Sequence, residues 1–69
     1  MTSESIGKTI RAYRKRLRLT QEQLALVSGT GIRFIRDLER GKPTCELGKS
    51  LFVLDTLGLE LDITSRGER

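Results

Sequence analysis

The chain has 69 residues and a net charge of +4, and its residues are 36% hydrophobic but only 4% aromatic. A chain of this length and composition can form one small domain with an aliphatic core. It has no histidine and a single cysteine, Cys45, which excludes a Ser–His–Asp triad, a Cys–His pair and a thiolate metal cluster, so we expect no enzyme, metal or cofactor. Because no apolar run approaches the roughly 18 residues of a membrane span, and residues 1–6 are too polar for a signal peptide, we expect a cytoplasmic protein with no membrane partner.

The first periodic segment, residues 5–17, predicts a helix. Four apolar residues recur at i, i+4, i+7 and i+11, which is the spacing of one helical stripe: Ile6, Ile10, Tyr13 and Leu17. Either Ser3 or Ser5 can cap the start of this helix through its side-chain hydroxyl.

A second, short helix is predicted to begin after Thr20. The Thr20 hydroxyl and the Gln23 side chain have the spacing of a capping box, in which each accepts a hydrogen bond from the other residue's backbone N–H. Three apolar residues are then expected to face inward: Leu24, Ala25 and Val27. The sequence Ser-Gly-Thr-Gly at residues 28–31 ends the helix.

Two further helices follow. The third is predicted from residue 31 or 32 to about residue 40, with Ile35 and Leu38 on its inner stripe and Gly41 beyond its end. Pro43 separates it from a fourth helix, which we expect Thr44 to cap and which extends to residue 57. The leucines of this fourth helix fall on one face: Leu47, Leu51 and Leu54.

Residues 59–64 alternate apolar and polar side chains with a period of two, which is the pattern of a β-strand. The apolar positions are Leu59, Leu61 and Ile63. Because so short a chain has no second strand, the simplest partner is the same segment of a second copy, paired about a two-fold axis; a disordered amphipathic tail is the alternative. We therefore expect a helical domain over 1–58, a dimerisation strand over 59–64 and a flexible tail over 65–69.

Positive charge is concentrated in the first part of the chain. Residues 1–43 contain ten Lys or Arg and four Asp or Glu, whereas residues 44–69 contain three and five. This asymmetry favours a polyanionic partner for the first part, although a solvated surface would explain the charge equally well.

The second and third predicted helices and their turn resemble the Xre/Cro-type helix-turn-helix family of phage repressors and bacterial regulators. The matching residues are Leu-Arg-Leu-Thr-Gln-Glu-Gln-Leu-Ala at 17–25, Gly29, and Ile-Arg-Asp-Leu-Glu-Arg-Gly-Lys at 35–42. The resemblance covers residues 5–57 and implies an all-α, lambda-repressor-like fold of about four to five helices that binds DNA. A helical hairpin that has glycine turns for structural reasons alone is the alternative.

In that family the second helix of the motif enters the major groove and the first crosses the backbone. By position, the resemblance assigns the groove-facing role to Ile32, Arg33, Arg36, Asp37 and Arg40, and phosphate contacts to Arg18, Thr20, Gln21 and Lys42. Arg33 would pair with guanine, and Asp37 would either accept a hydrogen bond from cytosine or orient Arg33 or Arg36 through an ion pair. Gln21 would bind phosphate or brace a base-reading side chain.

The resemblance also indicates structural roles and departures. Arg14 and Glu39 stand at positions that form a buried or half-buried ion pair in many members, so the resemblance implies a structural role for them and no contact with bases. Arg18 stands where glycine is frequent, which predicts either backbone strain or an additional phosphate contact. Thr30 stands where an aliphatic residue is common, so we expect a less tightly packed turn.

The C-terminal half is similar to HipB-type antitoxins, in which the helix-turn-helix domain ends in a strand shared across the dimer. The matching segments are Gly-Lys-Pro-Thr at 41–44, Leu-Phe-Val-Leu at 51–54 and Leu-Gly-Leu-Glu-Leu-Asp-Ile at 57–63. This resemblance implies a protein that represses its own operon and binds a HipA-like serine/threonine kinase toxin. Because a two-fold homodimer presents two copies of the groove-binding helix to one side of the duplex, we expect an inverted-repeat operator. A stand-alone regulator without a toxin, or a protein-interaction adaptor that has lost DNA binding, would fit the same residues.

Overall fold

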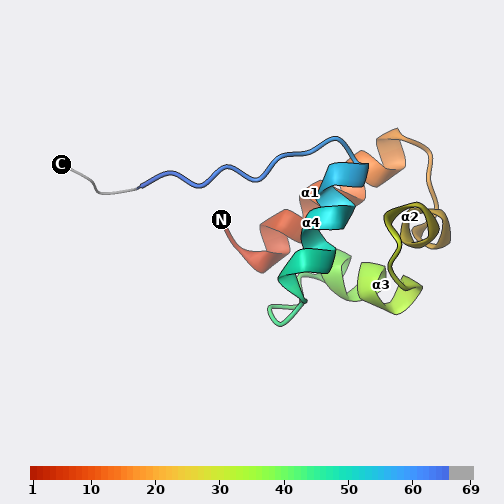
Figure 1. Cartoon of the computed structure of the whole chain (residues 1–69), viewed down its shortest axis with the longest axis horizontal. Coiled ribbons are helices and arrows are strands. Elements are labelled where there is room, and N and C mark those ends of the chain that lie inside the picture. The colour runs from red at the N-terminus through yellow and green to blue at the C-terminus, as the bar shows by residue number, and fades with distance from the viewer. Residues whose placement is uncertain (66–69) are drawn as a thin grey trace.

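A computed structural model describes residues 1–65 of the chain, and in this range it forms four α-helices (Figure 1). Their bounds are Ser3–Arg16 for α1, Gln21–Ser28 for α2, Ile32–Arg40 for α3 and Leu47–Thr56 for α4. α3 packs against α1 and α2, and α2 also packs against α4. The predicted all-α fold is thus confirmed for residues 1–65, and no helix among them has the length and apolar character needed to cross a membrane.

The start of α2 is fixed by the predicted capping box. The backbone N–H of Gln23 donates to the Thr20 hydroxyl over 3.0 Å, and the N–H of Thr20 donates to Gln23 Oε1 over 2.8 Å. At the other end, Gly29 adopts a left-handed conformation with φ 73°, which turns the chain toward α3. The hydroxyls of Ser28 and Thr30 lie 3.0 Å apart in this turn, so Thr30 has a polar partner there.

Two predicted caps are wrong. Thr2, rather than Ser3 or Ser5, caps α1, because the Thr2 hydroxyl accepts a hydrogen bond from the N–H of Ser5 over 3.0 Å. Glu46, rather than Thr44, caps α4. Its carboxylate accepts from the N–H groups of residues 48 and 49 over 2.8 and 3.1 Å, and a carboxylate at a helix start also suits the helix dipole.

The core is aliphatic, as the composition predicts. Eight apolar residues from the four helices and the residue after α4 form it: Ile10, Leu24, Ala25, Ile35, Leu38, Val53, Leu54 and Leu57. Burial of each valine, leucine or isoleucine side chain contributes roughly 1.5–3 kcal/mol to the stability of the fold. The inner positions predicted for α3 are confirmed, and so are Leu24 and Ala25 of α2.

Other predicted inner positions are wrong. Val27 is exposed because α2 turns another face toward the core. The stripe predicted for α1 packs in or against the core at Ile6, Ile10 and Tyr13, but Leu17 follows the last residue of α1 and is exposed. In α4 the predicted stripe is correct only at Leu54, since Leu47 and Leu51 are exposed. The buried residues of α4 lie in its C-terminal half, where the helix packs against α2.

The segment after α4 leaves the helices as an extended chain (Figure 1). The N–H of Leu59 donates to the carbonyl of Leu54 over 2.9 Å, and Leu59 packs at the edge of the core, whereas Leu61 and Ile63 are exposed. Residues 1–65 contain no strand, because a single chain gives residues 59–64 no neighbouring strand to pair with. Most of the tail predicted over 65–69 lies outside the described residues.

Candidate nucleic-acid interface

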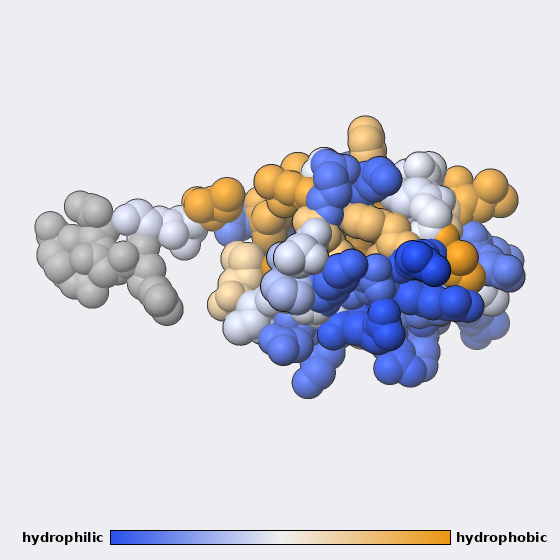
Figure 2. All heavy atoms as spheres, turned by 90° about the horizontal axis from the view of Figure 1, so that it is seen from below, coloured by the Kyte–Doolittle hydropathy of each residue, from blue (hydrophilic) through white to orange (hydrophobic). Residues whose placement is uncertain are grey.

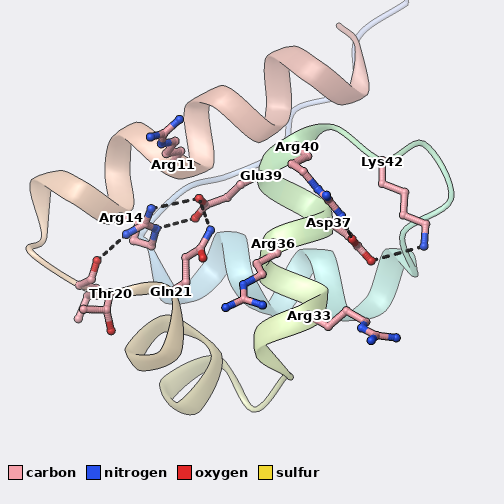
Figure 3. A pocket seen from close by; sticks show the side chains of 11 residues that line it. Arg11, Arg14, Thr20, Gln21, Arg33, Arg36, Asp37, Glu39, Arg40 and Lys42 are labelled. Atoms are coloured by element: carbon pink, nitrogen blue, oxygen red, sulfur yellow. Dashed lines mark hydrogen bonds and ion pairs between the residues drawn. The ribbon is translucent and has the colours of Figure 1, made fainter.

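An open cleft of about 1040 Å³ lies between α1, the start of α2 and α3 (Figure 3). Six cationic side chains line it: Arg11, Arg14, Arg33, Arg36, Arg40 and Lys42. Two acidic side chains, Asp37 and Glu39, line it as well. The cleft is therefore strongly basic, and the face on which α3 lies carries hydrophilic side chains over one half and apolar ones over much of the other (Figure 2).

The cleft brings together seven of the nine residues predicted to contact DNA: Thr20, Gln21, Arg33, Arg36, Asp37, Arg40 and Lys42. Ile32 instead packs partly against the core, and Arg18 lies in the turn between α1 and α2 without lining the cleft. Arg11 lines the cleft but was missed by the sequence reasoning. Its spacing of three residues from Arg14 on α1, which places both on one helix face, was the available signal.

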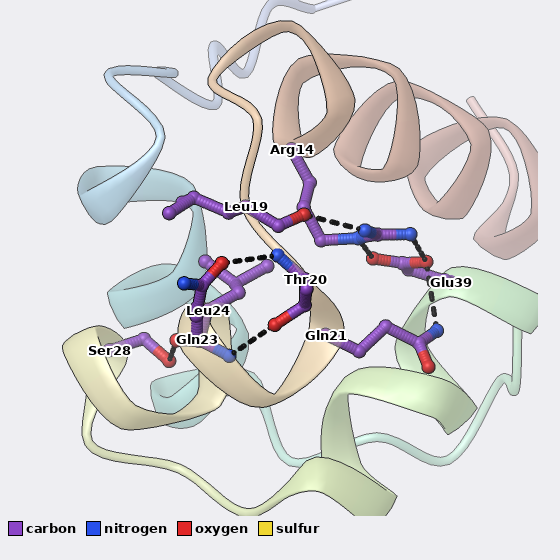
Figure 4. A network of polar contacts seen from close by, with 8 residues as sticks. All are labelled: Arg14, Leu19, Thr20, Gln21, Gln23, Leu24, Ser28 and Glu39. Atoms are coloured by element: carbon purple, nitrogen blue, oxygen red, sulfur yellow. Dashed lines mark hydrogen bonds and ion pairs between the residues drawn. The ribbon is translucent and has the colours of Figure 1, made fainter.

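A network around Glu39 fixes the position of α3 against α1 and α2 (Figure 4). Arg14 donates through Nε to Glu39 Oε2 over 2.6 Å and through Nη2 to Oε1 over 3.1 Å. Arg14 also donates to the carbonyl of Leu19 over 2.8 Å, and Gln21 donates to Glu39 Oε1 over 3.1 Å. The two charged side chains are only 10% and 5% exposed, so the predicted structural role of Arg14 and Glu39 is confirmed.

Asp37 pairs with cations at the end of α3 rather than with Arg33 or Arg36, so the ion pairs predicted for it are wrong. Its Oδ1 accepts from Arg40 over 2.6 Å and its Oδ2 accepts from Lys42 over 3.4 Å. The hydrogen bond from Arg40, together with the charge of Lys42, lowers the pKa of Asp37 despite a smaller opposing effect of burial. The carboxylate is therefore ionised at neutral pH.

Arg33 and Arg36 are cations of α3 whose guanidinium donors are unused within residues 1–65. Neither forms a hydrogen bond or ion pair with another residue in the range 1–65, and Figure 3 shows both side chains extending from α3 without contact to Asp37 or Glu39. A guanidinium group with unused donors can form two parallel hydrogen bonds to a phosphate or to the edge of a base. The cleft can thus bind a polyanion through side chains held on a fixed frame.

Two helices joined by a glycine turn, with a basic cleft along the second, define a helix-turn-helix protein, and sequence comparison gives the same class. The helix-turn-helix family profile matches residues 10–63, so the chain belongs to this family. Over 68 residues it is 53% identical to the uncharacterized HTH-type transcriptional regulator y4mF of Sinorhizobium fredii (strain NBRC 101917 / NGR234), an alignment that covers 99% of this chain and 90% of that protein. The predicted helix-turn-helix membership is confirmed, whereas the HipB-type subgroup is not distinguished by these comparisons.

Proposed function

We propose that this protein is a transcriptional repressor that binds DNA in a sequence-specific manner. The observation that carries the proposal is the pair Arg33 and Arg36, which have no ion-pair partner among residues 1–65, on a helix whose position is fixed by the buried Arg14–Glu39 pair. The net positive cleft supplies the sequence-independent attraction to phosphates, and the two arginines supply groups that distinguish bases. The similarity to a protein named as an HTH-type transcriptional regulator supports the same function.

The contacts divide into two kinds under this proposal. Arg33 and Arg36 point at base edges in the major groove, where an arginine pairs with the O6 and N7 atoms of guanine. Ile32 packs partly against the core, and the part of its side chain that stays exposed contacts a thymine methyl group. Phosphate contacts come from the residues around the ends of the motif: Arg18, Thr20, Gln21, Arg40 and Lys42. The N-terminus of α2 adds the positive end of its helix dipole to this set.

We further propose that the functional unit is a homodimer. Residues 60–64 form no backbone hydrogen bond with another residue of the described chain, and Leu61 and Ile63 expose apolar side chains there. Two apolar hollows of about 330 and 150 Å³ meet at Ile6, Leu54 and Leu61, which gives a second copy a surface to fill beside the strand. A two-fold dimer would place its two α3 helices in successive major grooves, about 34–36 Å apart, at an inverted-repeat operator.

The finer proposal is an antitoxin that represses its own operon and binds a HipA-like kinase. Its support is the similarity of residues 41–63 to HipB-type antitoxins. A stand-alone regulator is the alternative, because the related protein's name states regulation alone. We expect a HipA-like kinase gene beside the gene for this protein, and co-purification of the two products; if the neighbouring genes encode no such kinase, the stand-alone regulator is favoured.

DNA binding is tested with duplexes that the protein itself enriches from a random pool, compared with unselected duplexes of the same length. The affinity should fall steeply as salt is raised. Arg33→Ala should cost about 1–3 kcal/mol on the enriched duplex and relax the preference at one base pair per half-site. Lys49→Ala is the matched control, because Lys49 is exposed on α4 and does not line the cleft, so its loss should change the affinity little.

Two results would contradict the proposal. Equal weakening by Arg33→Ala on enriched and unselected DNA would show that Arg33 does not read a base. Absence of any salt-dependent binding by the wild-type protein would favour the adaptor, which keeps the fold without binding DNA.

A further inference from the structure

The six cations of the cleft fall into two groups. Arg14 is held by Glu39, while Arg40 and Lys42 are held by Asp37. Arg11, Arg33 and Arg36 have no such partner among residues 1–65. The Arg14–Glu39 pair is buried and structural. The Asp37 cluster, which consists of Asp37, Arg40 and Lys42, lies on the side of α3 that faces the cleft, so packing of the helices does not account for it.

In the Asp37 cluster the carboxylate is mostly buried and the two cationic side chains are exposed to solvent. The Asp37 side chain is only 15% exposed, whereas the side chains of Arg40 and Lys42 are 77% and 52% exposed. Each carboxylate oxygen already accepts a hydrogen bond from one of these cations. A cytosine amino group would therefore meet a covered acceptor, while a phosphate would meet two exposed cationic groups.

The backbone supports the same arrangement. Gly41 has φ 85°, and the N–H of Lys42 donates to the carbonyl of Asp37 over 3.0 Å, which closes the end of α3. This turn brings the Lys42 side chain back to Asp37, five residues earlier in the chain. Arg40 and Lys42 are thus held side by side at the end of the recognition helix before any ligand arrives.

We propose that Asp37 is a positioning residue that holds Arg40 and Lys42 as a preformed phosphate-binding pair and limits binding to unselected DNA. The inference rests on the proposed DNA binding. Holding the two cations lowers the conformational entropy lost when they meet phosphates in the specific complex. The negative charge of the carboxylate also lowers the net charge of the cleft by one unit per protomer. This weakens the attraction between the cleft and the phosphates, which is the same for every DNA sequence. Both effects increase the ratio of specific to non-specific affinity.

The test compares Asp37→Ala with Asp37→Asn, which keeps the shape of the side chain, and with Asp55→Ala as the matched control. Asp55 is exposed on α4 and does not line the cleft, so its replacement changes the net charge equally at another place. Both Asp37 variants should bind unselected duplex about threefold to tenfold more tightly, with a salt dependence steeper by about one phosphate per protomer. The ratio of affinities for enriched and unselected duplex should fall, while Asp55→Ala leaves it unchanged.

Two outcomes would overturn this inference while leaving the proposed function intact. If the Asp37 variants lose discrimination at a single base pair and bind unselected DNA as the wild type does, then Asp37 reads a base. If they match Asp55→Ala in affinity and salt dependence, Asp37 has no positioning role. Failure of the wild type to bind either duplex would instead remove the proposed function, and the inference with it.

Discussion

Arg18 is the non-glycine residue within residues 1–65 that adopts a left-handed backbone conformation, with φ 59°. It follows the last turn of α1, where its N–H donates to the carbonyl of Lys15 over 3.0 Å. A residue with a Cβ atom loses roughly 1–2 kcal/mol in this conformation. The backbone strain predicted at this position is therefore confirmed, and the chain retains an arginine at a place that favours glycine.

Arg18→Gly should stabilise the fold. Removal of the strain outweighs the extra freedom of glycine in the unfolded chain, so we expect a gain of about 0.5–1 kcal/mol and a melting temperature higher by about 2–8 °C. Arg18→Ala keeps the Cβ atom and is the control, which should show no such gain. Equal stability of the two variants in thermal unfolding would contradict the strain assignment. Both variants should weaken DNA binding to the same extent, because both remove the guanidinium group.

Individual side chains of the cleft differ in how far the sequence predicts them. The types of side chain in the cleft could be predicted, because a helix-turn-helix motif fixes which positions of α3 face outward. The contact of Asp37 with Lys42 could not, because the position of Lys42 depends on the left-handed turn at Gly41. The i,i+3 spacing of Asp37 and Arg40 on α3, by contrast, was a signal that the sequence reasoning passed over. Arg11 was missed for a related reason, since the approach of α1 to α3 is a tertiary contact.

At the scale of elements, the contact between α1 and α3 depends on a close approach at Gly7. A Cβ atom at Gly7 would lie 2.5 Å from the carbonyl oxygen of Leu38 and 2.7 Å from that of Glu39. These are backbone atoms of α3, so they cannot move aside as a flexible side chain does. The position of the recognition helix is therefore set by this glycine as well as by the ion pair at Glu39.

Gly7→Ala should destabilise the protein by about 1–3 kcal/mol through overpacking, although alanine favours a helix over glycine by about 1 kcal/mol. Gly31→Ala is the control, because a Cβ atom there would have no heavy atom within 4 Å. Denaturant unfolding of the two variants measures the difference. A Gly7→Ala variant as stable as the wild type would show that α1 and α3 do not approach so closely.

Helix positions were more predictable than helix faces. Apolar periodicity and the breaks at Gly29 and Gly41 locate the four helices, because they depend on local backbone preferences. The inner face of α4 was wrong at Leu47 and Leu51, since α4 has apolar residues on more than one face and packing against α2 selects among them. The strand over 59–64 remains a proposal, because its formation depends on a second chain.

At the scale of the whole molecule, the proposed dimer depends on the residues after α4. Truncation after Gly58 removes Leu59, Leu61 and Ile63, so it should convert a dimer into a monomer that keeps most of its helical circular dichroism. Because Leu59 packs at the edge of the core, the thermal stability should fall as well. Sedimentation of the truncated protein as an unchanged dimer would exclude the shared strand.

An NMR titration of the isotopically labelled protein with enriched duplex shows whether the basic cleft along α3 is the DNA-binding surface. We expect the largest amide shift changes at the start of α2 and along α3, between residues 20 and 42. The exposed face of α4, which does not line the cleft at Lys49 or Phe52, should change little. Shift changes confined to α4 and the segment after it would show that DNA binds to another surface and not to the cleft.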